Sequence, residues 1–105
     1  MEKTKFVPVI SINEVPAGTV RRCMVKDQAL ALYNVDGCIY ATQDECTHGR
    51  ASLADGYLEG EEIECPLHQG VFNVRTGEVV SRPCTVPLKT YKVEVKDDLI
   101  HVDVE

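Results

Sequence analysis

The stretch that decides the fold and the chemistry of this chain is CTHGRASLADGYLEGEEIECPLH, residues 46–68. It begins with Cys-Thr-His at 46–48 and ends with Cys-Pro-Leu-His at 65–68, so sixteen residues separate His48 from Cys65. Each end offers one thiolate and one imidazole donor, which lets it present a pair of metal ligands from a loop. Four ligands of these types suit zinc or an iron–sulfur centre.

The order of the four ligands separates these two possibilities. A Cys₂His₂ zinc finger usually places its two cysteines together and then its two histidines, whereas each pair here combines one Cys with one His. The mixed order favours an iron–sulfur centre. The alternative is a structural zinc module held by Cys46, His48, Cys65 and His68, which would be colourless, with one zinc and no labile sulfide.

Length and charge limit the class of protein. The 105 residues, 44% of them hydrophobic, can bury one modest core, which suits a single domain and excludes a second catalytic domain. Acidic residues outnumber basic ones by 17 to 11. The resulting net charge of −6 argues against nucleic acid or an anionic membrane surface as the partner.

Cysteine usage and hydropathy predict the compartment. The sequence has no run of 18 apolar residues and alternates polar and apolar residues soon after Met1, so we expect neither a membrane span nor a secretory signal. Its five cysteines are an odd number. In a chain without a signal they are more often metal ligands or core residues than disulfides. We therefore expect a cytoplasmic protein.

Segments on both sides of the quoted stretch have the alternation of β-strands. Strands are expected at 6–10, 19–25, 28–35, 38–42, 88–95 and 100–104. Pro8 suits an edge strand, and the spacing of Ser11 and Glu14 predicts a single helical turn. Asp36-Gly37 between apolar flanks predicts a hairpin.

The segment from about 44 to 83 differs from its flanks. It is denser in Cys, His, Gly and Pro, its alternation is weaker, and a tight turn is expected at 75–77. A sustained 3.6-residue period is missing from the whole sequence. We therefore predict an all-β, antiparallel sandwich or barrel, a single domain over 1–105 into which a turn-rich subdomain of about 44–83 is inserted.

At the four ligand positions the sequence resembles the Rieske iron–sulfur family, whose pattern is Cys-x-His, about sixteen residues, then Cys-x-x-His. In that family two His replace two Cys on one iron of a [2Fe–2S] cluster. The further matches are Gly49, Gly70, Phe72, the turn Thr76-Gly77 and Pro83. The resemblance implies a Rieske-type fold whose cluster-binding subdomain is the inserted segment. It also implies one [2Fe–2S] cluster, with Cys46 and Cys65 on one iron and His48 and His68 on the other.

Neutral imidazoles change the charge of such a cluster. Two ferric ions, two sulfides and two thiolates sum to zero, whereas four thiolates would leave a net negative charge that opposes an added electron. The potential therefore rises to about −150 to +300 mV, against about −400 mV for plant-type ferredoxins.

Four positions depart from the high-potential branch of the family. Ala51 and Leu67 stand where that branch has two disulfide-forming cysteines, and Gly70 and Phe72 stand where it has a Ser and a Tyr that donate to cluster sulfurs. Neither Gly70 nor Phe72 has a side-chain donor. We therefore expect a potential near the low end of the range, about −150 mV.

The resemblance is closest to the ferredoxin component of bacterial aromatic-ring dioxygenase systems. It implies a monomeric one-electron carrier between an NAD(P)H-dependent flavoprotein reductase and a terminal oxygenase. With two His committed, only His101 is left, so the chain cannot supply a 2-His-1-carboxylate iron site and is not the catalytic component. The alternative within the same fold is the small Rieske-like subunit of an assimilatory nitrite reductase.

The remaining candidates have simpler interpretations. Cys23 and Cys38 are expected as small core residues, Cys84 as a residue near the site but not a ligand, and His101 as a solvated strand position. The expected contact surface around the two histidines is Leu67, Gln69 and Pro83. Acidic residues around the motif either solubilise that face or steer basic partners toward it; they are Asp44, Glu45, Asp55, Glu59, Glu61, Glu62 and Glu64.

Restoring the two hydroxyl donors tests the prediction of a low potential. The double change Gly70→Ser and Phe72→Tyr should raise the reduction potential, because donors to the sulfurs stabilise the added negative charge. Protein-film voltammetry of the cluster-loaded variant measures it. An unshifted potential would contradict the argument from missing donors.

Overall fold

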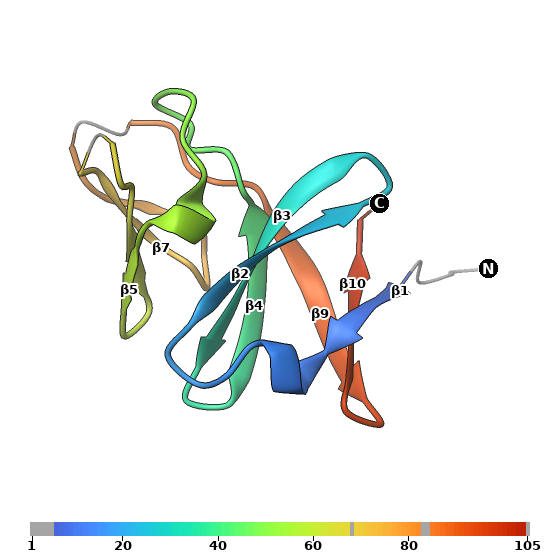
Figure 1. Ribbon diagram of the computed structural model, residues 1–105. Coiled ribbons are helices and arrows are strands. Elements are labelled where there is room, and N and C mark those ends of the chain that lie inside the picture. The colour runs from blue at the N-terminus through green and yellow to red at the C-terminus, as the bar shows by residue number, and fades with distance from the viewer. Residues whose placement is uncertain (1–5, 68, 83–84, 105) are drawn as a thin grey trace.

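A computed structural model describes residues 6–67, 69–82 and 85–104 of the chain (Figure 1). In these residues no helix is long and apolar enough to cross a membrane. The elements are β1 (Phe6–Ser11), η1 (Ile12–Glu14), β2 (Val20–Val25), β3 (Gln28–Val35), β4 (Cys38–Gln43), η2 (Leu53–Asp55), β5 (Tyr57–Glu59), β6 (Glu62–Glu64), β7 (Val71–Asn73), β8 (Val79–Ser81), β9 (Thr90–Lys96) and β10 (Leu99–Asp103). The prediction of an all-β protein is confirmed.

Six strands form an antiparallel sheet in the order β1-β10-β9-β4-β3-β2. Strand β1 lies at its edge, as Pro8 predicted, and the register shifts between Pro8 and Ile10. The predicted helical turn is also present, because the Ser11 side chain accepts a hydrogen bond from the Asn13 N–H at the start of η1. Strand β9 joins the two halves of the sheet by pairing with both β10 and β4.

Two-residue turns fix the register of the three long hairpins. Asp36 and Gly37 have φ of 52° and 95° between β3 and β4, which confirms the predicted hairpin. Lys26-Asp27 and Asp97-Asp98 form the same kind of turn, with positive φ at all four residues. Two successive positive φ angles match the right-handed twist of the flanking strands.

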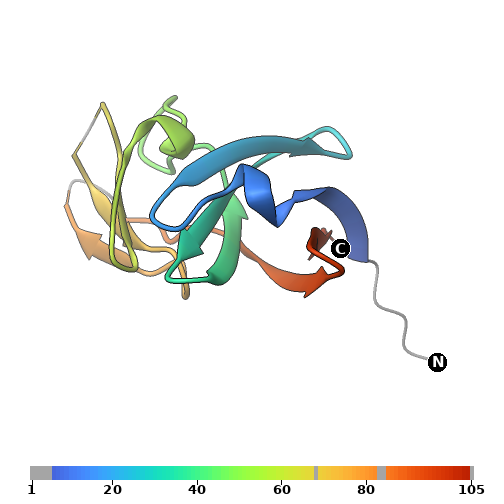
Figure 2. The ribbon, with the colours of Figure 1, turned by 60° about the horizontal axis from the view of Figure 1, so that its bottom comes forward.

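A second, four-stranded sheet contains β5-β6-β7-β8 in that order. Its predicted tight turn lies between β7 and β8, where the Asn73 side chain accepts from the N–H groups of Arg75 and Thr76 at 2.8 and 3.1 Å. Figure 2 shows this sheet at one end of the molecule and the paired strands β1 and β10 at the other. The helix η2 packs against β2 and β3, between the two sheets.

Strand β3 separates two buried cores. Leu30 and Leu32 contribute to one core, whereas Ala31 and Tyr33 contribute to the other. All four side chains are 0% exposed. The first core fills the six-stranded sheet and includes Val15, Cys23, Val25, Ala41, Ile100, Val102 and Val104. The second lies toward the four-stranded sheet and includes Cys46, Leu53, Ile63, Cys65, Phe72, Val74 and Leu88.

Gly77 connects the turn of the second sheet to the chain that leads into β9. Its carbonyl accepts from the Leu88 N–H at 2.8 Å, its φ is +81°, and an added Cβ would lie 2.4 Å from the Leu88 carbonyl oxygen. Only glycine tolerates both the dihedral angle and the close approach.

We therefore predict that Gly77→Ala lowers the free energy of unfolding by about 2–4 kcal/mol, the sum of left-handed strain and overpacking. Gly18→Ala is the matched control, since Gly18 has φ +83° and no atom near the added Cβ; it should cost only about 1–2 kcal/mol. Urea unfolding measures both, and equal losses would contradict the role of the Leu88 contact.

Candidate metal centre

The first pair of predicted ligands lies in a loop with a closed neck. Glu45 and Ser52 form a β-bridge across the neck, and the Cys46 N–H donates to the Ala51 carbonyl at 2.9 Å. Within the loop, Cys46 is 3% exposed, whereas His48 is exposed to solvent. The same short loop therefore directs a thiol inward and an imidazole outward.

The second pair follows β6. The Cys65 N–H donates to the Gly70 carbonyl at 2.8 Å, and the Gln69 N–H donates back to the Cys65 carbonyl at 3.0 Å. Gln69 has a left-handed φ of +60°, which lets the loop close over six residues. Cys65 is 0% exposed, while Leu67 is 68% exposed. His68 lies outside the described residues.

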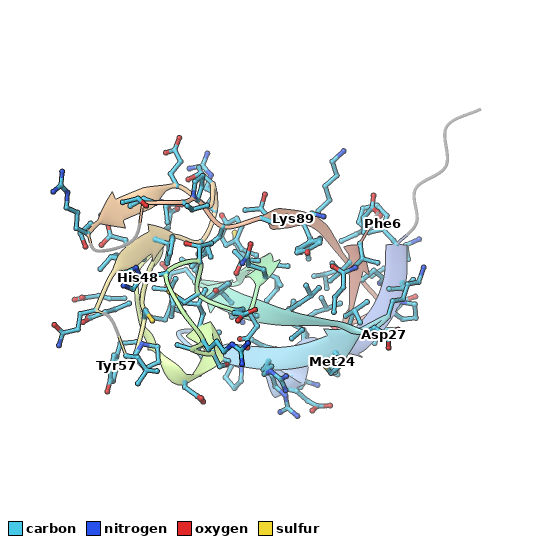
Figure 3. All side chains as sticks on the ribbon, turned by 90° about the horizontal axis from the view of Figure 1, so that it is seen from above. Phe6, Met24, Asp27, His48, Tyr57 and Lys89 are labelled. Carbon is cyan, nitrogen blue, oxygen red and sulfur yellow. The ribbon has the colours of Figure 1, made fainter. Side chains whose placement is uncertain are left out.

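The fold brings the two predicted cysteine ligands together. Cys46 and Cys65 belong to the same cluster of buried side chains, with Phe72 and Tyr33 among its members. His48 lies at the same end of the molecule as Tyr57, opposite the end marked by Phe6 and Asp27 (Figure 3). Two thiols in one buried cluster, with an exposed imidazole two residues after the first, are donor types that suit a soft or borderline metal.

Tyr33 belongs to this buried cluster, and its hydroxyl is already hydrogen-bonded to Thr42. It lies 2.8 Å from Thr42 Oγ1, and the Thr42 hydroxyl donates to the Gln43 carbonyl at 2.7 Å. Because the Thr42 proton is committed, Tyr33 is the donor of the shared bond. Burial raises the pKa of the Tyr33 hydroxyl, so it keeps this proton at neutral pH. The hydroxyl is therefore not available as a donor to a sulfur.

A third segment, around residues 86–89, contacts the first ligand loop. Thr47, between the two predicted ligands of that loop, donates its hydroxyl to the Val86 carbonyl at 2.6 Å. Beside it, Gln43 and Lys89 exchange two hydrogen bonds at 2.9 and 2.8 Å. These hydrogen bonds join residues more than 35 positions apart and were not predicted individually, although Cys84 of the same segment was expected near the site. Pro83 and Cys84 lie outside the described residues.

Three predictions about single residues need correction. Cys38 is exposed rather than a core residue, because it begins β4 directly after the Asp36-Gly37 turn at the outer end of the hairpin. His101 is half-buried rather than solvated, since β10 lies between β1 and β9. Asp44 is 3% exposed, so it is not part of an acidic surface.

One other prediction about a single residue is confirmed. Cys23 is buried in the core of the six-stranded sheet. Burial raises the pKa of its thiol, although the positive charge of Arg21 opposes the shift, so the thiol is neutral and unreactive. Leu67 and Gln69 of the predicted contact surface are both exposed, and their contact with a partner stays a prediction. Val86, at 55% exposure, adds to the apolar surface beside the ligand loops.

Removing the Thr47 hydroxyl tests whether the third segment holds the ligand loop. Thr47→Val, which keeps the shape of the side chain, should lower the free energy of unfolding by about 1 kcal/mol through loss of the bond to Val86, and Thr47→Ser should restore most of it. Thermal unfolding gives the comparison.

Ser52 offers a matched control. Its Oγ is buried and has no hydrogen-bond partner among the described residues. Ser52→Ala should therefore leave the stability unchanged or slightly higher, because it removes an unsatisfied polar atom. Equal losses in Thr47→Val and Ser52→Ala would contradict the assigned role of the Thr47 bond.

Comparisons with known proteins agree on one family. Residues 5–92 match the Rieske [2Fe-2S] domain family. The ferredoxin component of the naphthalene 1,2-dioxygenase system of Pseudomonas aeruginosa is 46% identical over 99 residues, which cover 94% of this chain and 95% of that protein.

Solved structures are similar over nearly the whole chain. A Sphingomonas yanoikuyae B1 ferredoxin superposes with a TM-score of 0.91 at 38% identity, covering 96% of this chain and 100% of the other. One chain of a complex of reduced oxygenase and oxidized ferredoxin in carbazole 1,9a-dioxygenase gives a TM-score of 0.89 at 46% identity. The match covers 98% of this chain and 96% of that one.

Proposed function

The chain belongs to the Rieske [2Fe-2S] domain family, and on that premise we propose that Cys46, His48, Cys65 and His68 hold its cluster. One observation supports the assignment most strongly. Two loops far apart in sequence place Cys46 and Cys65 in one buried cluster of side chains. The donor types fit the group, because a Rieske centre needs two thiolates on one iron and two imidazoles on the other.

The chain's own residues shape this site. When bound, the cluster supplies a one-electron carrier. The buried positions of Cys46 and Cys65 exclude water from the sulfur ligands, while the exposed His48 presents an imidazole edge toward a partner. The neutral imidazoles keep the total charge low, and the shortage of side-chain donors at Gly70, Phe72 and Tyr33 supports a potential near the low end, about −150 mV.

The chain works as the ferredoxin of an aromatic-ring dioxygenase system. It accepts electrons from an NAD(P)H-dependent flavoprotein reductase and passes them to a terminal oxygenase. Relatives that are 43–46% identical over almost their full length are ferredoxin components of such systems, which supports this role over that of a nitrite reductase subunit. The family membership likewise opposes a structural zinc module.

Docking involves the surface beside the exposed imidazole. Leu67, Gln69 and Val86 are exposed there and offer a small contact area. A shuttle must dissociate, so we expect an interface below about 1,200 Å² in total. We further infer that the protein is a monomer in which a cluster-binding subdomain of about 44–83 is inserted in a basal β domain. We also infer a cytoplasmic location, where reducing conditions keep thiols such as Cys23 and Cys38 free.

Spectroscopy of the anaerobically purified protein tests the proposal. We expect two irons and two labile sulfides per chain, a visible absorption that bleaches with dithionite, and an EPR signal only in the reduced state. Reduced protein should then support turnover by a terminal oxygenase supplied with a reductase. Colourless protein with one zinc would instead establish the structural module.

Replacing an imidazole with a thiolate tests the ligand assignment. His68→Cys should retain some cluster but lower its potential toward the about −400 mV of four-thiolate clusters, because the added thiolate brings negative charge. His101→Gln is the control, since His101 lies on β10 and its Nδ1 faces the Leu99 carbonyl at 3.1 Å. Voltammetry should show a shift only in the first variant, and an unchanged or raised potential there would refute the assignment.

A further inference from the structure

Asp44 is a buried carboxylate two residues before the proposed ligand Cys46. Its side chain is 4% exposed, and all four of its polar groups are engaged. The backbone N–H donates to the Ala29 carbonyl at 3.0 Å, and the backbone carbonyl accepts from the Leu53 N–H at 2.7 Å. Oδ1 accepts from the Ala54 N–H at 3.1 Å, and Oδ2 lies 3.2 Å from Arg22 Nε.

Asp44, rather than Ser52, caps the start of η2 with its side chain. Ser52 occupies the N-cap position of η2 but makes no side-chain capping bond. The Asp44 carboxylate accepts from Ala54, in the first turn of η2, instead. The carboxylate therefore joins three elements at the neck of the first ligand loop: the end of β4, the start of η2 and, through Arg22, strand β2.

Arg22 supplies the charge that this buried carboxylate needs. It lies on β2 opposite Ala31 of β3, and half of its side chain, 53%, is exposed. A carboxylate without a nearby cation would be costly to bury. The second oxygen of Asp44 has Arg22 as its ionic partner, with Nε at 3.2 Å.

We propose that the Arg22–Asp44 ion pair is a positioning device for the iron–sulfur ligand loop, which fixes the neck of the loop and offsets the carboxylate charge next to the cluster. This inference rests on the assignment of Cys46 and His48 as ligands. Arg22 and Asp44 touch neither the cluster nor a partner in this role. They act through the position of the loop and through the charge that they place near it.

Charge determines the sign of each substitution. Arg22→Gln leaves a buried negative charge close to Cys46, which makes an added electron less favourable and lowers the potential. Asp44→Asn removes that negative charge and leaves Arg22 uncompensated, which raises the potential. A merely structural loss of packing would not produce shifts of opposite sign in the two variants.

The experiment compares cluster-loaded wild-type protein with Arg22→Gln, Asp44→Asn and the double variant. We expect Arg22→Gln to lower the reduction potential and Asp44→Asn to raise it. The potential of the double variant should lie between those of the two single variants. Iron loss to a chelator should be about fivefold faster in each single variant, since the neck of the loop is weakened. Arg22→Lys, which keeps the charge, should restore most of the wild-type potential.

Arg21→Gln is the matched control. Arg21 neighbours Arg22 on β2 and carries the same charge, but it pairs with Glu14 at 3.4 Å, away from the loop. Its removal should leave both the potential and the rate of iron loss unchanged. Equal shifts in Arg21→Gln and Arg22→Gln would overturn the proposal, because the effect would then come from net charge.

The outcomes separate this inference from the proposed function. Wild-type protein without a Rieske spectrum would refute the ligand assignment itself. Wild-type protein with that spectrum, together with an Arg22→Gln variant of unchanged potential and iron loss, would refute only the role of the ion pair. Because Arg22 is half exposed, its variant tests the idea even if Asp44→Asn fails to fold.

Discussion

Along β3 successive side chains point to opposite faces, and both faces are covered. Leu30 and Leu32 enter the core of the six-stranded sheet, while Ala31 and Tyr33 enter the core that contains Cys46 and Cys65. A slip of one residue in the pairing of β3 with β4 would exchange these two sets between the cores. The two-residue Asp36-Gly37 turn prevents the slip, and it thereby fixes the position at which β4 ends and the first ligand loop begins.

Both ligand loops are closed by backbone hydrogen bonds. Their cysteine side chains are buried, whereas several of their polar side chains are exposed to solvent. The bonds from Cys46 to Ala51 and from Cys65 to Gly70 satisfy the backbone where the thiols turn inward. The thiols thereby enter an apolar environment that also holds Phe72. The exposed His48 lies where a partner can approach, so one short loop serves both burial of the redox centre and access to it.

Local pattern predicted the strands and turns well, because alternation and Asp-Gly turns act within a few residues. Two predictions from local pattern were wrong. Cys38 begins a mostly apolar strand but lies at the exposed outer end of a hairpin. Asp44 is buried, although acidic residues are mostly exposed. Burial of Asp44 depends on Arg22, which is 22 positions earlier, and on η2. A pattern within one segment cannot detect such a partner.

The sequence by itself determined the donor types, their spacing and the all-β class, since these follow from residue identity and from the two-residue period of strands. It also determined the lack of hydroxyl donors at Gly70 and Phe72. Only the tertiary structure decided which thiols share a core, that Thr47 is held by Val86, and that the Tyr33 hydroxyl donates its hydrogen bond to Thr42. These contacts join segments distant in sequence, and their formation depends on the register of whole strands rather than on any local preference.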